Sequence, residues 1–172
     1  MKLFRYPKSL KGKVAVFTIG CALVLSSLAI LARANNSQDF VDARKVAPNS
    51  LIKQAISENY LTTDDTIFPQ VLKLNGEKEL YIFDFNTREL CGAVGCLYAV
   101  YTREGQRVLS VYLKSDFPNK KVKLFSADGV ENKFPCLLTR QFDGANQKIV
   151  ATRYCYQGNQ LVAVFYQLLE VK

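Results

Sequence analysis

The stretch FPCLLTRQFDGANQKIVATRYCYQGNQLVAVFYQL, residues 134–168, contains three apolar and aromatic runs separated by two turn signals. The runs cover residues 134–142, 148–156 and 161–168, and the dipeptides Asp143-Gly144 and Gly158-Asn159 mark the turns. Runs of this length with short, glycine-containing connections are typical of antiparallel strands joined as hairpins. The stretch therefore predicts three consecutive antiparallel strands near the end of the chain.

The same pattern continues upstream of residue 134. Five further apolar runs share it: residues 67–74, 79–85, 97–102, 107–113 and 122–126. Asn75-Gly76, Glu104-Gly105 and Asp128-Gly129 supply the turn signals. About eight short strands with short connections predict a mainly β domain, built as an antiparallel meander or a small barrel or sandwich. The strand order and the closure of the sheet stay open at this point.

One short amphipathic helix is expected before the strands. Pro48 is followed by Asn49, a helix-capping residue, and by apolar residues at positions 51, 52, 55 and 56, which is helical spacing. Residues 35–47 are polar without a clear period and are predicted to be a tether. Residues 48–172 have the length of one ordinary domain, so we expect a single β-rich domain with one N-terminal helix.

The first 34 residues have the order of an export signal. Basic residues without any acid precede an uncharged segment at residues 14–32, and Ala32-Arg33-Ala34 resembles a cleavage site. We predict a signal peptide over residues 1–34. The alternative is an uncleaved anchor at residues 14–32, because nineteen uncharged residues approach the length that crosses a bilayer. Both interpretations place the rest of the chain outside the cytoplasm, in a periplasm, in a lumen or secreted.

The basic character of the chain belongs mainly to this segment. It holds six of the 23 basic residues and none of the 15 acidic residues, so the remainder carries a net charge of +2. A pI of about 9.3 is therefore no sign of nucleic-acid binding, and we expect no nucleic-acid partner. Membrane contact is expected only through residues 14–32, if they are retained. Lys120, Lys121 and Lys123 form a basic cluster beside a predicted turn, which is typical of a solvated loop.

Four cysteines lie beyond the predicted signal, an even number that favours two disulfides in an oxidising compartment. In a hairpin that turns around Ala145-Asn146, facing residues have numbers that add to 291, and Cys136 and Cys155 meet this condition. Directly opposed strand positions have the short separation that a disulfide requires. Gly92 and Gly95 allow the chain to double back so that Cys91 can meet Cys96.

Redox chemistry and metal binding are the alternatives to a structural disulfide for Cys91 and Cys96. A thioredoxin-like site places C-x-x-C at the start of a helix, whereas this pair has four intervening residues and leads into a predicted strand. A zinc site would need further ligands, and the chain has no histidine. The sequence therefore predicts a structural disulfide, no metal site and no cofactor.

A resemblance enters at these cysteines. Its motifs are Asp84-Phe85-Asn86, Leu90-Cys91-Gly92, Gly95-Cys96-Leu97-Tyr98, Pro135-Cys136-Leu137 and Arg153-Tyr154-Cys155-Tyr156 followed by Gly158. Over about residues 79–166 the chain resembles a group of uncharacterised exported bacterial proteins of cyanobacterial type, β-rich domains with a C-G-x-x-G-C loop. The resemblance implies export and disulfides, and it implies no reaction.

The absence of histidine removes Ser-His-Asp and Cys-His catalysis. Carboxylate pairs remain, and Asp84 and Glu89, which flank a predicted turn, are the candidate pair if the protein is a hydrolase. Solvated turn acids are the competing interpretation.

Aromatic residues are the more suggestive feature. Most of them are expected in the core, and Tyr154, Tyr156 and Tyr166 in the C-terminal strands are the candidate binding surface. The sequence favours a non-catalytic extracytoplasmic binding or accessory module that acts on an envelope protein or a glycan. The alternatives are a carboxylate-based hydrolase and a membrane-anchored accessory subunit of a membrane complex.

Overall fold

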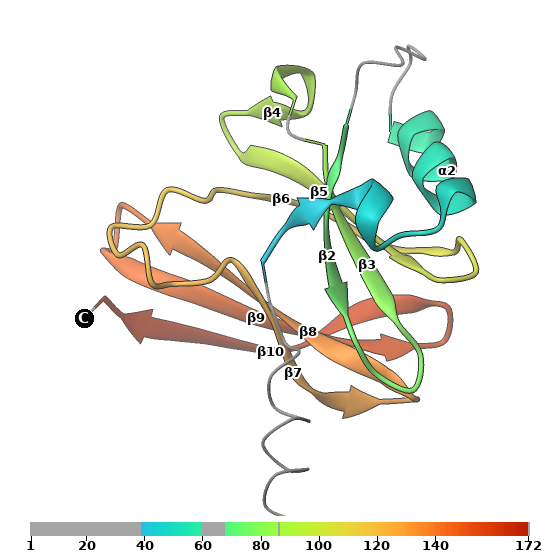
Figure 1. The fold of residues 1–172 in the computed structure, drawn as a ribbon. Helices are drawn as coiled ribbons and strands as arrows, with labels where there is room; N and C mark the ends of the chain where they lie inside the picture. The colour runs from blue at the N-terminus through green and yellow to red at the C-terminus, as the bar shows by residue number, and fades with distance from the viewer. Residues whose placement is uncertain (1–38, 60–67, 86, 172) are drawn as a thin grey trace, which may run out of the picture. The chain divides into compact units, whose positions relative to one another are not determined.

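The fold is shown in Figure 1, a computed structural model that describes residues 39–59, 68–85 and 87–171. These residues belong to the structural unit 38–172. The predicted signal peptide at residues 1–34 and the alternative anchor at residues 14–32 lie outside the described residues. Within the described ranges no helix combines the length and the apolar character needed to cross a bilayer.

The first sheet is formed by the N-terminal half of the unit. Its strands are β1 (Val41–Asp42), β2 (Gln70–Leu74), β3 (Leu80–Asp84), β4 (Cys91–Gly92), β5 (Gly95–Thr102) and β6 (Arg107–Leu113). β2 pairs with β1 and β3, β5 pairs with β3 and β4, and β6 pairs with the other edge of β5, all antiparallel. Asn75-Gly76 and Glu104-Gly105 connect hairpins in this sheet, as predicted.

The second sheet is a four-stranded meander in the order β10-β9-β8-β7. Its strands are β7 (Phe125–Glu131), β8 (Phe134–Asp143), β9 (Lys148–Gln157) and β10 (Gln160–Glu170). β8 and β9 pair from Leu137 opposite Tyr154 to Asp143 opposite Lys148, so the predicted register is confirmed. β10 and β7 are therefore the two edge strands of this sheet.

A helix and two sheets form three layers around two apolar cores. The inner core lies between the sheets and includes Ile82, Tyr98 and Val100 from the first sheet with Phe125 and Leu137 from the second. The outer core lies between the other face of the first sheet and the helix. Figure 1 shows this helix, α2 (Asn49–Asn59), beside β3.

The helix begins and packs as the apolar spacing predicts. Leu51, Ile52 and Ala55 are its buried residues, and they pack with Phe83 and Tyr101 of the sheet. The short 3-10 helix η1 (Ala43–Lys45) contributes buried Ala43 to the same core. The mainly β fold class is thus confirmed as two antiparallel sheets with one α-helix, and the described strands form no closed barrel.

The Asp128-Gly129 turn is a correction to the sequence prediction. The two residues lie inside β7, where the pairing with β8 shifts register between Ala127 and Val130. The hairpin turns instead at Asn132 and Lys133, which both have positive φ (51° and 73°), as in the two-residue turns that suit twisted strands. Gly129 has a φ of 83° and lies in the bulge. This glycine therefore marks a β-bulge and not the predicted turn.

The predicted tether is a second point of difference. Val41 pairs with Val71, the backbone N–H of Ala43 donates to Pro69 O at 3.1 Å, and Ala43 has no exposed surface. Residues 41–45, which the sequence assigned to a polar tether over residues 35–47, therefore belong to the folded unit. A two-residue strand is too short to show a hydrophobic period, which explains why the pattern missed it.

Candidate functional site

Both predicted disulfides are present. Cys91 and Cys96 are joined across the β4–β5 hairpin with their Cα atoms 3.9 Å apart. Cys136 and Cys155 are joined across β8 and β9 with a Cα separation of 4.4 Å, and neither has exposed surface. All four sulfurs of the described part of the chain are therefore bonded, and none is a free thiol for redox or nucleophilic chemistry.

A group of potential metal ligands lies at the second disulfide. A carboxylate oxygen of Glu131 lies within 4.8 Å of the sulfur atoms of Cys136 and Cys155. Metal binding by cysteine requires the thiolate, and these sulfurs are bonded to each other. Only the carboxylate is left, so this group does not form a metal centre.

The candidate carboxylates Asp84 and Glu89 lie on different elements. Asp84 is the last residue of β3, opposite Tyr98 in the ladder with β5. Glu89 is exposed in the 3-10 helix η2 (Arg88–Leu90), where its backbone N–H donates to the capping Thr87 hydroxyl at 3.4 Å. Neither residue lines the hollows described below. Glu89 is thus placed as a turn residue.

Tyr98 and Tyr101 are buried structural residues of β5. The Tyr101 hydroxyl donates to Glu58 Oε2 at 2.9 Å and accepts from Asn59 Nδ2 at 2.9 Å. Burial, followed by the Glu58 bond, raises the pKa of Tyr101 to about 12. Burial likewise raises the pKa of Tyr98 above its ordinary value. Both hydroxyl groups are therefore protonated at neutral pH, and Tyr101 connects β5 to Glu58 and Asn59 of α2.

The three tyrosines of the predicted binding surface have different environments. Tyr156 stacks on Phe134 with ring centroids 4.2 Å apart, and its hydroxyl lies 3.3 Å from Gln106 Oε1. Tyr154 is half-buried against the inner core, and burial raises its pKa. Tyr166 is 61 % exposed. The structure thus places Tyr154 and Tyr156 in supporting positions and leaves Tyr166 available at the surface.

Tyr166 is surrounded by other exposed apolar residues of β10. Four side chains define what we call the β10 surface: Val164 (43 % exposed), Phe165 (53 %), Tyr166 (61 %) and Leu168 (49 %). Phe165 faces Arg153 in the ladder with β9, and Tyr166 faces Thr152. Successive residues of a strand point to opposite faces of the sheet, so the β10 surface is apolar on both faces.

The predicted binding surface did not include Val164, Phe165 and Leu168. A continuous run such as Leu161-Val162-Ala163-Val164-Phe165 is typical of a strand buried on both faces. This run differs from a buried strand by its position at the edge of the second sheet, where residues 163–168 are exposed. That position is a tertiary property without a local signal.

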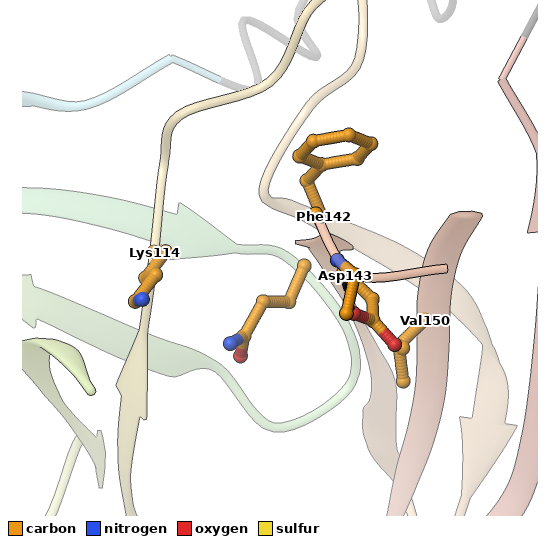
Figure 2. A pocket seen from close by; sticks show the side chains of 7 residues that line it. Lys114, Phe142, Asp143 and Val150 are labelled. Carbon is orange, nitrogen blue, oxygen red and sulfur yellow. Dashed lines mark hydrogen bonds between the residues drawn. The ribbon is translucent and has the colours of Figure 1, made fainter. Parts of the chain in front are cut away.

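An open hollow of about 540 Å³ lies between Lys114 and the β8–β9 hairpin (Figure 2). Lys114, beyond β6, lies on one side, and Phe142, Asp143 and Val150 of the β8–β9 hairpin lie on the other. The Asp143 carboxylate accepts from the backbone N–H of Ala145 at 3.0 Å and from Asn146 Nδ2 at 2.7 Å, bonds that lower its pKa. Asp143 is therefore an ionised turn residue. Val150 faces Leu168 across the ladder, which joins the hollow to the β10 surface.

A second hollow, of about 400 Å³, is lined by two residues of the predicted basic cluster. Lys121 and Lys123 line it together with Arg140, Ser126 and Glu170. Arg140 donates to Ser126 Oγ at 3.0 Å and to Lys123 O at 3.3 Å. Arg140 lies 17 residues from Lys123, so its contribution was invisible in the linear cluster. The carboxylate of Glu170 offsets part of the positive charge.

Comparison with protein families, with curated proteins and with solved structures finds no match. The resemblance to exported bacterial proteins therefore stays an expectation from the sequence, and the geometry alone supports any proposal on function.

Proposed function

We propose that the chain is a non-catalytic binding module that works outside the cytoplasm and recognises protein through the β10 surface. The observation that carries this proposal is the exposure of Phe165 and Tyr166 on opposite faces of one edge strand. Exposed apolar patches of about a few hundred Å² or more are typical of contact sites. Tyrosine and phenylalanine are also enriched in the centres of protein interfaces.

The two disulfides support the proposed compartment. Two bonded pairs persist in an oxidising environment and are rare in the cytosol. We propose a periplasmic, lumenal or secreted location, with attachment to a membrane through residues 14–32 if that segment is retained.

Protein fits the β10 surface better than a glycan does. A glycan stacks its sugar rings on one flat aromatic platform, whereas here aromatic and aliphatic side chains alternate between the two faces of an edge strand. Val164 and Leu168 add aliphatic area, which has no polar tip for sugar hydroxyls. An envelope protein that packs around the strand meets both faces at once.

The proposal is tested by capture from an envelope extract with the exported protein as bait. Phe165→Ala and Tyr166→Ala should each weaken capture of the principal partner about thirtyfold, because a hot-spot truncation costs about 2 kcal/mol or more. Tyr112→Ala is the matched control, since Tyr112 is 49 % exposed on the outer face of the first sheet. Asp84→Asn and Glu89→Gln should leave capture unchanged.

Equal capture by the Tyr166→Ala and Tyr112→Ala proteins would contradict the β10 surface as the binding site. Turnover of a substrate that disappears in a folded Asp84→Asn or Glu89→Gln protein would replace the module with a hydrolase.

A further inference from the structure

The edge of β10 has few of the features that normally prevent strands from pairing between molecules: its one register irregularity lies between Ala163 and Phe165. Edge strands are commonly protected by charged side chains, proline, shortness or bulges. β10 is 11 residues long, and from Gln160 to Leu169 it contains neither a charged residue nor a proline. No strand of the described ranges pairs with its outer side.

The opposite edge of the same sheet shows the contrast. β7 carries Asp128 and Glu131, and its ladder is interrupted between Ala127 and Val130. Two acids and a bulge in seven residues protect this edge in the usual way. The two edges differ in protection although they belong to one sheet, which points to an occupant for β10.

We propose that the occupant is a second copy of this chain, whose β10 pairs with the first antiparallel and joins the two sheets into one of eight strands. The inference rests on the proposed function and names the partner at that same surface. A twofold axis perpendicular to the sheet continues each face of one copy into the same face of the other. Such an interface uses one surface twice, as closed dimers do.

A register centred on Gln167 keeps side-chain parity between the two copies and pairs the aromatic residues with leucines. With Gln167 opposite its own copy, Tyr166 lies opposite Leu168 on one face, and Phe165 lies opposite Leu169 on the other. Aromatic side chains paired with aliphatic ones across strands are favourable. The register irregularity of β10 between Ala163 and Phe165 then falls at the end of the paired segment rather than in its middle.

Charge is compatible with this arrangement. Glu170 is the sole charged residue of β10, it lies 3.2 Å from Lys148 of its own sheet, and the register places it opposite Val164 of the other copy. No like charges face each other along the paired strands. From Gln160 to Leu169, β10 is thus an uncharged and mostly apolar strand, which suits pairing with a second copy of itself.

The available area sets the strength of the dimer. With about 200 Å² for a fully exposed aromatic side chain, Phe165 and Tyr166 offer about 230 Å² per copy. Val164 and Leu168 raise the apolar total to about 350 Å², while standard interfaces bury about 800 Å² per partner. The apolar total is less than half of that standard area, so we expect a small interface and a dimer that dissociates on dilution.

The test compares single substitutions in the exported full chain, in detergent if residues 14–32 are retained. Sedimentation velocity over a concentration series should show a monomer–dimer equilibrium. Gln167→Lys puts two like charges directly opposite each other, which should raise the dissociation constant about fivefold or more. Gln160→Lys makes the same change at an exposed position outside the paired segment and should leave the constant unchanged.

Cross-linking tests the register independently of stability. Gln167→Cys places two cysteines opposite each other at the axis, at a Cα distance of about 4.5–5.5 Å that permits a disulfide. Oxidation should give a covalent dimer of Gln167→Cys and none of Gln160→Cys. A protein that stays monomeric, a dimer insensitive to Gln167→Lys, or a failure of the Gln167→Cys cross-link would each overturn the inference. Capture of an envelope protein that depends on Tyr166 would then still support the proposed function.

Discussion

Single residues of this fold show where a sequence signal and its structural reason diverge. Gly92 and Gly95 were both expected to permit the Cys91–Cys96 loop. The structure assigns the requirement to Gly95, which has a φ of 119° and whose Cβ position would lie 2.3 Å from the carbonyl carbon of Leu113. Gly92 has open space around it. The sequence identified the loop correctly, but only the approach of β6 explains which glycine it needs.

Tyr101 gives a pH-dependent prediction at the same scale. Its pKa is about 12 in the folded protein, against an ordinary value of 10.0, because burial and the Glu58 bond favour the neutral hydroxyl. A raised pKa contributes stability that is fully present below about pH 10 and is lost as the pH rises through 12. Urea unfolding between pH 8 and pH 11.5 should therefore show stability falling above pH 10.

Tyr101→Phe is the informative variant for this effect. It should be less stable than the parent at pH 8, because the bonds with Glu58 and Asn59 are lost, and its stability should fall less steeply above pH 10. Tyr98 also has a raised pKa, so the fall is reduced rather than removed. Identical slopes for the two proteins would show that Tyr101 ionises equally in the folded and unfolded states.

At the scale of elements, the two disulfides stabilise the fold to different degrees. Cys136 and Cys155 are 19 residues apart and join two long strands, whereas Cys91 and Cys96 are five residues apart in an exposed loop. The chain-entropy argument gives about 3 kcal/mol for the longer loop and about 2 kcal/mol for the shorter one. Cys136 and Cys155 are also buried in the sheet.

We therefore expect paired Cys136→Ala and Cys155→Ala substitutions to lower the free energy of unfolding by about 1 kcal/mol more than paired Cys91→Ala and Cys96→Ala substitutions. Urea titration of the two double variants measures this difference. Non-reducing digestion with mass spectrometry verifies the remaining disulfide in each variant. A larger loss for the Cys91 and Cys96 pair would show that the loop, rather than the central hairpin, limits stability.

The strands show how far the sequence predicts elements. The β8–β9 register followed from one assumption, a turn around Ala145-Asn146, because an antiparallel ladder has a constant sum of facing residue numbers. The sequence predicted a strand over residues 122–126 and a turn at Asp128-Gly129, whereas β7 continues through Gly129, which lies in a bulge. The β10 run predicted a strand correctly, but the run itself did not show which of its apolar residues are exposed. Local patterns give strand identity, and neighbours in space decide exposure.

For the whole unit, the arrangement of layers follows from two-sided burial of the first sheet. Strands β2, β3 and β5 place alternate residues in the outer core under α2 and in the inner core against the second sheet. The second sheet has no corresponding helix among the described residues, and its β10 end extends into solvent. The first sheet is thus covered on both faces and the second sheet on one, and the candidate binding surface lies at an edge of this second sheet.

The last prediction concerns where the mature chain begins. Ala32 and Ala34 supply the small residues that signal cleavage requires, so we expect the first residue to be Asn35. Cleavage there keeps the contacts that the described residues make at this end of the unit. Asp39 Oδ1 lies 3.5 Å from Lys123 Nζ, and Val41 pairs with Val71. N-terminal sequencing of the protein from the membrane and soluble envelope fractions measures the start directly. A Met1 peptide in the membrane fraction would instead establish an anchor at residues 14–32, and the β10 surface would then act on partners close to the membrane.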